Sequence, residues 1–401
     1  MSVASGNRVV SLGCRLNIAE SEAIEAMLDG AETPTVVVNS CAVTAEAVRQ
    51  SRRAVRRLRR DHPAARLVVT GCAATITPGD FAAMPEVDAV IANPAKLSPQ
   101  SWRATVDAPA PDAPAPAFRR LTRAFVPVQT GCDHACTFCI IPAGRGASVS
   151  SPIGEVLRRV ERHLDHGAGE IMLTGVDLTG WGADLGAGQR LGDLTAAILD
   201  TFPVLARLRL SSLDGVEIDD RLFALLTQEA RVMPHVHLSL QSGDDLVLKR
   251  MKRRHSRAQA LGLVERLRAR RPAIAIGADL IAGFPTETQA MHESNLSLIR
   301  EARIVHGHIF PYSPRPGTPA ARMPQVDPAV VRARAAELRG AVAAVRTDWL
   351  HGLIGSPRAV LAERDGTGHS GEFAPYRLPP DTVAGRTIIL TPTTIREGLL
   401  A

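Results

Sequence analysis

Short apolar runs rich in β-branched residues alternate with longer helical patterns along most of the chain. In the first hundred residues these runs are VVSL, VVV, LVVT and VDAVIA, at 9–12, 36–38, 67–70 and 87–92. Alternation of strand-like and helix-like segments predicts a parallel sheet with helices on its faces. We therefore expect an α/β fold that begins with an open parallel sheet domain over residues 1–106.

The same rhythm resumes after a proline-alanine run, DAPAPDAPAPA, at 107–117. Such a composition is typical of an extended linker between domains. Strand-like segments then follow at 125–129, 171–174, 207–211, 236–240, 274–281 and 305–310. A complete barrel of this kind has eight βα units, so six units predict a partial (βα)6 barrel over 118–350.

The pattern changes once more near residue 352. Short apolar runs are now separated by glycine and proline turns, without a long helical pattern and without a clear final strand. This arrangement is typical of small antiparallel β structures. We predict a small all-β barrel over 351–401.

Charge and composition narrow the possible partners. The 401 residues include 47 lysines and arginines against 41 aspartates and glutamates, a net charge of +6, which is a mild indication of a polyanionic partner. Aromatic residues make up only 3%, which argues against a protein that binds single strands mainly by stacking. The pattern indicates no signal peptide and no membrane span, so we expect a cytoplasmic protein without a membrane partner.

Three of the six cysteines lie in one short segment, GCDHACTFCIIP, directly after the first strand of the predicted barrel. The spacing of Cys132, Cys136 and Cys139 suits one iron-sulfur cluster, and no fourth cysteine is near. The fourth iron would then be open to a ligand, as a reaction centre requires. A structural zinc site and buried thiols without metal are the alternatives. For zinc, His134 lies between two cysteines, where chelation is strained.

The remaining cysteines are Cys14, Cys41 and Cys72, and each follows a predicted strand by one to three residues. The carboxyl ends of parallel strands form the ligand crevice of an open α/β sheet. We expect the three thiols to converge there and to hold a second cluster with an open iron. The alternative is that each cysteine is a small apolar residue at a strand end.

Several motifs connect these cysteines with a known family. The segment CDHACTFC resembles the cluster loop of the radical S-adenosylmethionine (SAM) superfamily, and SLGCRLN, VVNSCAVT and VVTGCAA resemble the amino-terminal module of its methylthiotransferases. Further similar segments are LTGVDLTGWG, LSLQSGDDLVLKRMKRRH, LIAGFPTET and FPYSPRPGTPA, and the tail resembles the RNA-binding β-barrel of these enzymes. The chain departs from the family at CIIPAGRGASVS, where a tyrosine and an arginine-rich continuation are usual.

The family has three branches, which act on isopentenyladenosine in tRNA, on threonylcarbamoyladenosine in tRNA, and on an aspartate of a ribosomal protein. LSLQSG at 238–243 and TAEAVRQSRRAVRR at 44–57 are most similar to the threonylcarbamoyladenosine branch. The resemblance therefore implies conversion of N6-threonylcarbamoyladenosine, next to the anticodon, into its 2-methylthio derivative. The other two branches and a non-catalytic iron-sulfur protein that binds RNA are the alternatives.

The resemblance also implies SAM and two [4Fe-4S] clusters as cofactors. The cluster on Cys132, Cys136 and Cys139 would bind SAM and cleave it on reduction, giving a 5′-deoxyadenosyl radical that takes hydrogen from C2 of the adenine. The cluster on the other three cysteines would supply sulfur, and another SAM would supply the methyl group. The implied partners are tRNA and an electron donor such as flavodoxin or ferredoxin, while the sulfur source stays open.

Residues at the ends of the predicted barrel strands are candidate SAM contacts, because barrel active sites lie there. They are Thr174, Gly175, Ser211, Ser212, Gln241, Ser242, Gly283 and Pro285. Turn formation is the alternative role for such residues. Asp177 and Tyr312 are candidates on the substrate side.

Two basic runs are candidate contacts for tRNA phosphates. The first lies at 49–60 within one predicted helix, where a solvated helix face is the alternative. The second, at 249–257, adjoins a strand end beside the proposed site.

Overall fold

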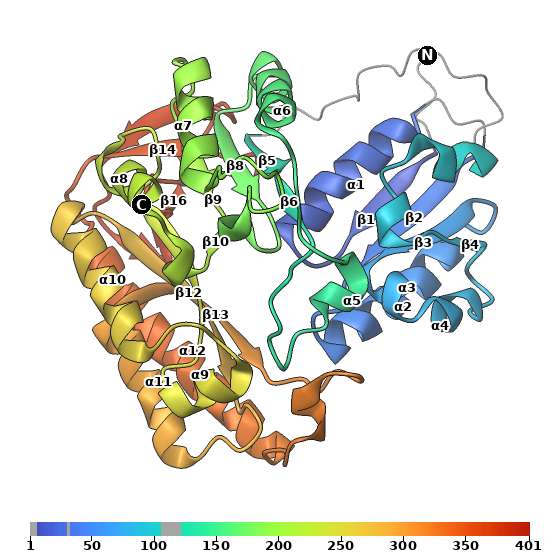
Figure 1. Cartoon of the computed structure of the whole chain (residues 1–401). Helices are drawn as coiled ribbons and strands as arrows, with labels where there is room; N and C mark the ends of the chain where they lie inside the picture. The colour runs from blue at the N-terminus through green and yellow to red at the C-terminus, as the bar shows by residue number, and fades with distance from the viewer. Residues whose placement is uncertain (1–5, 30–32, 106–121) are drawn as a thin grey trace.

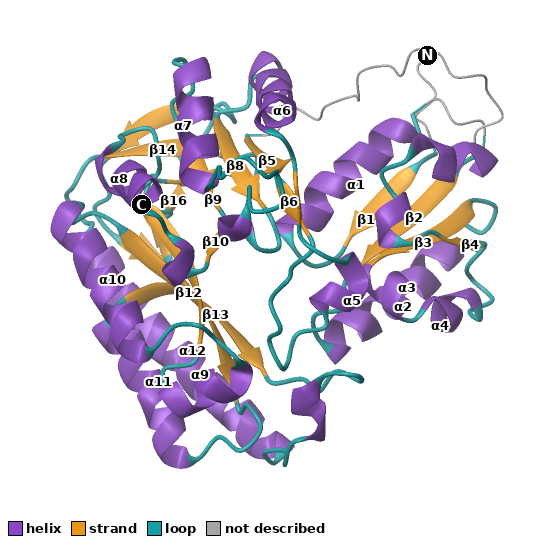
Figure 2. Ribbon diagram, viewed as in Figure 1, coloured by secondary structure: helices purple, strands orange, loops and turns teal. Residues whose placement is uncertain are grey.

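The computed structural model describes residues 6–29, 33–105 and 122–401 (Figure 1). The predicted linker at 107–117 lies outside these residues. The described chain forms an amino-terminal sheet with helices, a central set of parallel strands with helices outside it, and a carboxyl-terminal sheet (Figure 2). The α/β fold with parallel sheets is therefore confirmed.

The amino-terminal sheet has four parallel strands in chain order. They are β1 (Arg8–Ser11), β2 (Thr35–Ser40), β3 (Arg66–Gly71) and β4 (Ala89–Val90). The last strand is shorter than the predicted run at 87–92. Its paired residues are Ala89 and Val90. At the flanking Asp88, the N–H donates to the Leu67 carbonyl at 2.9 Å and the carboxylate accepts the Leu67 amide at 2.6 Å.

Helices cover both faces of this sheet, and β2 is therefore buried on both sides. The elements are α1 (Arg15–Met27), α2 (Ala45–Asp61), α3 (Cys72–Ile76), α4 (Pro78–Ala82), η1 (Asn93–Ala95) and η2 (Pro99–Thr105). Val37 packs with Ile24 of α1 in one apolar cluster. Val36 packs with Val55 of α2 in another, so successive strand residues face opposite helices, as the strand period requires.

The central part contains two neighbouring parallel sheets, β5-β8-β9 and β10-β11-β12-β13. Their strands are β5 (Arg123–Pro127), β8 (Glu170–Thr174), β9 (Leu208–Leu210), β10 (Ser212–Leu213), β11 (His235–Gln241), β12 (Ala275–Ala282) and β13 (Ile304–Pro311). The third predicted strand is divided at Ser211 between the two sheets. With that division, the strands correspond to the six predicted units of a partial barrel.

Helices lie on the outside of these strands (Figure 2). They are α6 (Ile153–Asp165), α7 (Leu191–Thr201), α8 (Asp220–Gln228), α9 (Asp245–Met251), α10 (Arg257–Arg270), α11 (Gln289–Glu301) and α12 (Pro328–His351), with η3 (Leu178–Gly180), η4 (Gly215–Glu217) and η5 (Pro319–Arg322) between them. The segment after β5 carries β6 (Gln129–Thr130), α5 (Ile141–Arg145) and β7 (Val149–Ser150). The main apolar core lies between the outer helices and the strands.

The carboxyl-terminal sheet has six strands in the order β17-β14-β15-β16-β19-β18. They are β14 (Arg358–Ala362), β15 (Thr367–His369), β16 (Pro375–Arg377), β17 (Thr387–Leu390), β18 (Ile395–Arg396) and β19 (Leu399–Leu400). All pairings are antiparallel except that of β16 with β19. The sequence had indicated no clear final strand, whereas the structure ends in the two-residue strands β18 and β19.

This sheet lies against the amino ends of the barrel strands. Phe373 has its ring centroid 5.0 Å from the Arg123 guanidinium carbon and 4.7 Å from that of Arg209. The Arg209 side chain is fully buried and binds Glu170, the first residue of β8. The opposite, carboxyl ends of the strands are therefore left for a ligand site. Within the described ranges, no helix combines the length and apolarity that a membrane crossing needs.

Candidate active site

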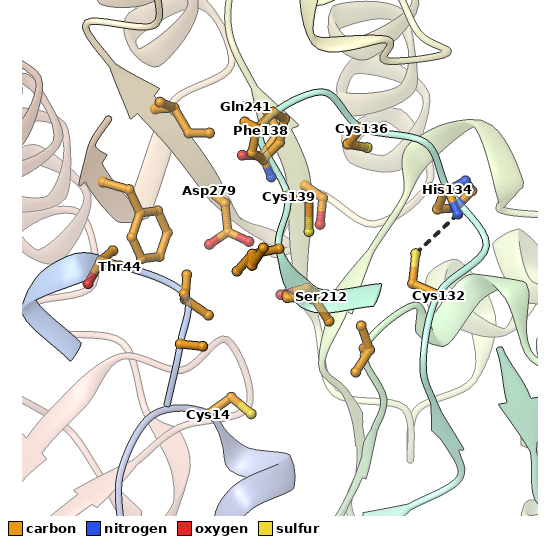
Figure 3. Close-up of a pocket in the computed structure, with 18 of the residues that line it drawn as sticks. Cys14, Thr44, Cys132, His134, Cys136, Phe138, Cys139, Ser212, Gln241 and Asp279 are labelled. Carbon is orange, nitrogen blue, oxygen red and sulfur yellow. Dashed lines mark hydrogen bonds between the residues drawn. The ribbon is translucent and has the colours of Figure 1, made fainter. Parts of the chain in front are cut away.

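All six cysteines line one cavity of about 350 Å³ between the amino-terminal sheet and the carboxyl ends of the barrel strands (Figure 3). Figure 3 shows Cys14 on one wall and Cys132, Cys136 and Cys139 on the other. The two predicted groups of three thiols thus face the same space. We call the group of Cys14, Cys41 and Cys72 the sheet triad, and the group of Cys132, Cys136 and Cys139 the loop triad.

The sheet triad is assembled from three strand ends. Cys14 precedes α1, Cys41 follows β2 directly, and Cys72 begins α3 after β3. Gly13 has a positive φ of 101°, and a Cβ on it would lie 2.8 Å from the Cys41 sulfur, so only glycine allows this approach. Burial raises the pKa of the Cys41 thiol, and the neighbouring Cys14 and Cys72 raise it further. The three thiols are therefore close enough to interact electrostatically.

Two asparagines that the sequence analysis did not select contact the sheet triad. The Cys14 thiol lies 3.8 Å from Oδ1 of Asn17, and Nδ2 of Asn93 donates to the Cys72 sulfur at 3.3 Å. Nδ2 of Asn93 also donates to the Gly144 carbonyl of α5 at 2.7 Å. The same polar side chain thus touches a thiol of the sheet domain and a helix of the barrel. Asn17 lies in the SLGCRLN motif, and its resemblance to the family was the only indication in the sequence that Asn17 belongs to the site.

A buried charge cluster joins the two halves beside this triad. Arg145 of α5 donates to Asn17 Oδ1 at 2.6 Å and to Glu20 Oε1 at 2.8 Å, while Lys96 Nζ lies 2.5 Å from Glu20 Oε2. Burial opposes the charge of Arg145, but its hydrogen bonds and charge pairing with Glu20 outweigh burial and raise the pKa of Arg145. Two cations share one carboxylate here, so a net positive charge faces the thiols. In the sequence, Arg145 belongs to CIIPAGRGASVS, the segment that departs from the family pattern, and nothing there indicated its buried partners.

The loop triad lies between β6 and α5. The Cys132 sulfur accepts the His134 backbone N–H at 3.4 Å, which is the dashed contact in Figure 3. Nη1 of Arg253 lies 3.8 Å from the Cys136 sulfur. Burial raises the pKa of Cys132 to about 12 and that of Cys139 to about 11. These thiols therefore keep their protons until a metal binds, because metal ligation displaces the thiol protons.

Charged residues surround this loop. Arg253 binds Asp214 at 2.8 Å, and His134 Nε2 lies 2.9 Å from Asp177. The hydrogen bond with Asp177 raises the pKa of His134. Potential ligand atoms of Cys132, His134 and Asp177 come within 4.8 Å of one another, so a zinc site on these groups would use only one of the three loop cysteines. The contact with Asp177 explains the position of His134 without a zinc ion.

The structure divides the candidate SAM contacts. Gly175, Ser212 and Gln241 line the cavity, and so do the substrate-side candidates Asp177 and Tyr312. The residues that do not line it are Thr174, Ser211, Ser242, Gly283 and Pro285.

Those five residues occupy other surroundings. Ser242 Oγ donates to Asn295 at 3.1 Å, and the Gly283 N–H donates to Glu287 at 3.1 Å, with Pro285 in the same turn. These contacts agree with the turn role. Thr174 and Ser211 are buried, and their hydroxyls have no hydrogen-bond partner in the described part of the chain.

Asp279 of β12 is a cavity residue that the sequence analysis missed. Its Oδ1 lies 2.9 Å from Nε2 of His237 and 3.0 Å from Nδ1 of His308. Burial alone would raise the pKa of Asp279, yet the two imidazoles hold it well below its usual range. The floor of the cavity therefore carries an anionic carboxylate held by two rings. Asp279 stands directly before LIAGFPTET, a segment that resembles the family. Nothing in that segment indicated that His237 and His308 would contact Asp279.

The basic runs differ in their exposure. On α2, arginines pair with acids nearby: Arg49 with Glu46 at 2.6 Å and Arg52 with Asp80 at 2.7 Å. Such exposed pairs fit the solvated face that was the alternative. In the second run, the side chain of Arg253 is only 8% exposed and points to the cavity, so it is not the surface phosphate contact that the run suggested.

The donors around the cavity fit two [4Fe-4S] clusters. The chain has six cysteines, and three face the cavity from each wall. Three thiolates per cluster leave one iron without a protein ligand. The open coordination sites of both groups would then face the space that separates the walls.

Comparison with known proteins agrees with this arrangement. Residues 126–299 match the family described as "Radical SAM superfamily", and residues 7–92 match "Uncharacterized protein family UPF0004". A threonylcarbamoyladenosine tRNA methylthiotransferase, MtaB, of Rickettsia prowazekii (strain Madrid E) is 42% identical, over 98% of this chain and 96% of that protein. A tRNA-2-methylthio-N(6)-dimethylallyladenosine synthase of Erythrobacter litoralis (strain HTCC2594) is 33% identical, over 91% and 88% of the two chains.

Solved structures match the fold at low identity. The radical SAM methyltransferase TsrM of Kitasatospora setae, with tryptophan and a SAM analogue bound, matches with a TM-score of 0.53 at 16% identity, over 75% of this chain and 66% of that chain. At this identity the likeness concerns the fold alone.

Proposed function

Because this chain belongs to the radical SAM methylthiotransferase family, we propose that it converts N6-threonylcarbamoyladenosine in tRNA into the 2-methylthio derivative. The observation that carries the proposal is the facing of the sheet triad and the loop triad across one cavity. The choice of nucleoside is supported by 42% identity to a threonylcarbamoyladenosine enzyme, against 33% to a dimethylallyladenosine enzyme.

We assign one cluster to each triad. The cofactors are SAM and two [4Fe-4S] clusters, which together supply radical generation, sulfur and the methyl group. Cys132, Cys136 and Cys139 would hold the cluster at the barrel mouth, where Gly175, Ser212 and Gln241 are the proposed SAM contacts. Cys14, Cys41 and Cys72 would hold the cluster on the sulfur side.

The chain itself positions the reacting groups and excludes water. Phe138, Ile281 and Phe310 contribute apolar wall to the cavity, which limits water around the adenine. Arg253 places a positive charge beside Cys136, and Arg145 does the same for the sheet triad through Asn17. These charges favour the anionic thiolates that ligation requires.

The remaining parts have roles outside the cavity in this proposal. Residues 1–106 form the domain with the sheet triad, 107–117 the linker, 118–350 the radical SAM barrel, and 351–401 a β module that binds RNA. An electron donor such as flavodoxin or ferredoxin would reduce the cluster held by Cys132, Cys136 and Cys139. The enzyme acts in the cytoplasm, where tRNA is its partner.

The experiment is mass spectrometry of tRNA nucleosides from cells without this protein. We expect 2-methylthio-threonylcarbamoyladenosine to disappear, its unmethylthiolated precursor to accumulate, and the wild-type gene to restore the product. A catalytically silent control carries the loop triad replaced by Ala. Loss of the 2-methylthio-dimethylallyl nucleoside instead, or an unchanged nucleoside profile, would contradict the proposal.

A further inference from the structure

The charged groups beside the two triads differ in their balance. Near the sheet triad, Glu20, Lys96 and Arg145 form a buried group whose side chains are only 6%, 1% and 3% exposed. We call it the basic group, because it holds two cations and one carboxylate. A buried charge is screened less by salt than a surface charge, so this group acts strongly on its surroundings.

The basic group lies next to sulfurs of the sheet triad. Nη2 of Arg145 donates to Asn17 Oδ1 at 2.6 Å, and the same oxygen lies 3.8 Å from the Cys14 sulfur. The residue before Arg145 packs on the third cysteine, since a Cβ on Gly144 would lie 3.2 Å from Cβ of Cys72. Helix α5 thus brings the charge of Arg145 to this triad.

Lys96 supplies the excess charge of the basic group. Its Nζ donates to Glu20 Oε2 at 2.5 Å and to Asn39 Oδ1 at 3.3 Å. Asn39 is in β2, two residues before Cys41. Glu20 also accepts from Arg145, at 2.8 Å and 3.0 Å. One carboxylate cannot neutralise both cations, so a net positive charge remains beside the sheet triad.

Asn93 adds a hydrogen bond to a sulfur of the same triad. Its buried Nδ2 donates to the Cys72 sulfur at 3.3 Å and to the Gly144 carbonyl at 2.7 Å. A carbonyl oxygen can only accept, so the nitrogen of the amide must face Gly144, which fixes the orientation of the side chain. The sheet triad therefore has a fixed N–H donor at one sulfur.

The loop triad has similar sulfur contacts, but the described residues around it give no excess of positive charge. Three carboxylates pair there with two arginines and one histidine, which are Asp177, Asp214, Glu217, Arg253, Arg254 and His134. Oδ2 of Asp177 lies 4.0 Å from the Cys132 sulfur. Two guanidinium groups and three carboxylates give no positive sum, even with His134 protonated.

We propose that Lys96 and Asn93 raise the reduction potential of the cluster on the sheet triad above that of the cluster on the loop triad. This inference rests on the proposed function, which assigns one cluster to each triad. The potential of an iron-sulfur cluster depends on net charge, on hydrogen bonds to its sulfurs and on solvent exposure. Positive charge and N–H donors favour the reduced state, because that state carries one more negative charge.

Solvent exposure does not reverse this order. In the sheet triad, Cys14 is exposed while Cys41 and Cys72 are buried, and all three thiols of the loop triad are intermediate. Exposure therefore does not favour one triad as a whole, and the charge balance decides.

The order of the potentials gives the triads different roles in electron transfer. An electron that enters the enzyme resides first on the cluster of the sheet triad. The stronger reductant is then the cluster of the loop triad, which lies beside the proposed SAM contacts Gly175, Ser212 and Gln241. Lys96 and Asn93 touch neither SAM nor tRNA in this proposal, and they act on the reaction only through the sheet triad.

The test is a redox titration of the cluster-loaded enzyme, followed by electron paramagnetic resonance. The signal that added SAM changes identifies the cluster of the loop triad, and variants with one triad replaced by Ala confirm both signals. In wild type, we expect the signal of the sheet triad to appear at the higher potential. Lys96→Met and Asn93→Leu should each make reduction of this cluster about tenfold less favourable, which is about 59 mV for one electron, and should change the other by less than about twofold.

Matched variants separate charge from structure. Arg57→Met removes an exposed cation from α2 in the same half and should leave both potentials unchanged, since solvent screens exposed charges. Lys96→Arg keeps the charge and should keep the potential. A purely structural role of Lys96 would reduce the iron content of Lys96→Met without moving the potential of the clusters that remain. If Asn93→Leu does not hold iron, the wild-type order and Lys96→Met decide.

The outcomes separate this inference from the proposed function. Equal or inverted potentials in wild type, or unchanged potentials in the folded variants, would overturn the inference and leave the choice of nucleoside untouched. Wild type with about four irons instead of about eight would overturn the assignment of one cluster to each triad. A tRNA nucleoside analysis that shows the dimethylallyl product instead would overturn the proposed nucleoside without changing either potential.

Discussion

The sheet triad and the loop triad present the same donors to one cavity but are built in different ways. The loop triad comes from one segment, 132–139, between β6 and α5. The sheet triad comes from three strand ends as distant as Cys14 and Cys72. Local spacing produces the first group, whereas the second exists only when the parallel sheet is formed. The comparison teaches that a ligand set can be encoded by a loop or by a topology.

Their surroundings differ as well. The loop triad depends on its own barrel for charge, through Arg253 and its partner Asp214. The sheet triad depends on the other half, because Arg145 and the Gly144 carbonyl belong to α5. The sheet triad should therefore be the more sensitive of the two to the contact between the halves.

The largest expected effect separates the triads completely. Replacing Cys132, Cys136 and Cys139 with Ala should leave about four irons of about eight and abolish SAM cleavage, because three thiolates hold each cluster. Replacing the sheet triad should also leave about four irons, but 5′-deoxyadenosine should still form while the methylthio product disappears. Iron analysis and product chromatography check both. SAM cleavage by the loop variant would show that the roles of the triads are assigned wrongly.

A smaller effect should come from the contact between the halves. Arg145→Met removes the partner of Glu20 and Asn17, so we expect product formation to fall by about 100-fold through misplacement of the sheet triad. SAM cleavage without substrate should change by less than about threefold, because the loop triad keeps its own contacts. The control is Arg158→Met, an exposed arginine on α6. Equal losses of both activities would mean that the triads share their support.

Glycines before the cysteines offer a third comparison. Gly71 and Gly131 have φ values of 93° and 73°, and a Cβ on them would lie 2.4 Å from the Ser40 oxygen and 1.8 Å from the Ala147 oxygen. We expect each Gly→Ala change to destabilise its own half by about 2–4 kcal/mol, from backbone strain and overlap. Chemical denaturation measures this.

The matched control for these glycines is Gly340→Ala in α12, where a Cβ would meet nothing within 4 Å. That change should stabilise by up to about 1 kcal/mol, since alanine favours a helix. Loss of both iron sets in Gly71→Ala would argue against independent triads.

The smallest expected effect distinguishes the two halves in acid. Burial holds the pKa of His235 well below its usual range and lowers that of His306 to about 3. Both rings are neutral in the folded barrel and become charged on unfolding below about pH 6.5. Their contribution to stability is therefore complete above that pH and is lost as the pH falls toward 3.

Single-tryptophan variants can follow this difference. Trp349 lies 5.3 Å from His306, centroid to centroid, and reports on the barrel, whereas Trp102 is buried in the amino-terminal half. Between pH 7 and 5, the midpoint of urea unfolding at Trp349 should fall more than that at Trp102. His306→Gln should reduce the difference, and His351→Gln, on an exposed residue, should not. Parallel midpoints in wild type would refute the assignment to these rings.

Features that depend on neighbouring residues, such as strands and the positions of cysteines after them, could be predicted from the sequence. The strand runs predicted the parallel sheets. The sequence placed each group of cysteines at strand ends, but it did not predict that both groups would line one cavity, as they do. Candidate SAM contacts were less well defined, because consecutive residues of a strand point to opposite sides. In three of the four pairs only one residue lines the cavity: Gly175 and not Thr174, Ser212 and not Ser211, Gln241 and not Ser242. In the fourth pair, neither Gly283 nor Pro285 lines it.

Contacts between distant segments could not be predicted. Arg145 meets Glu20, and Asn93 meets the Gly144 carbonyl, only because α5 packs against the amino-terminal half. Neither residue is marked by a local pattern in the sequence. Their partners are determined by the packing of the two halves, which periodicity and composition do not describe.

The buried contact of α5 with the amino-terminal half could also hold two fragments of this chain together. A cut within 107–117 would leave Arg145 and Gly144 on one fragment and Glu20, Asn17 and Asn93 on the other. The two fragments would then carry matching charged and polar surfaces. Co-expressed as separate chains, they should reassemble without a covalent connection, which makes the enzyme suitable for a split reporter whose signal depends on one buried arginine.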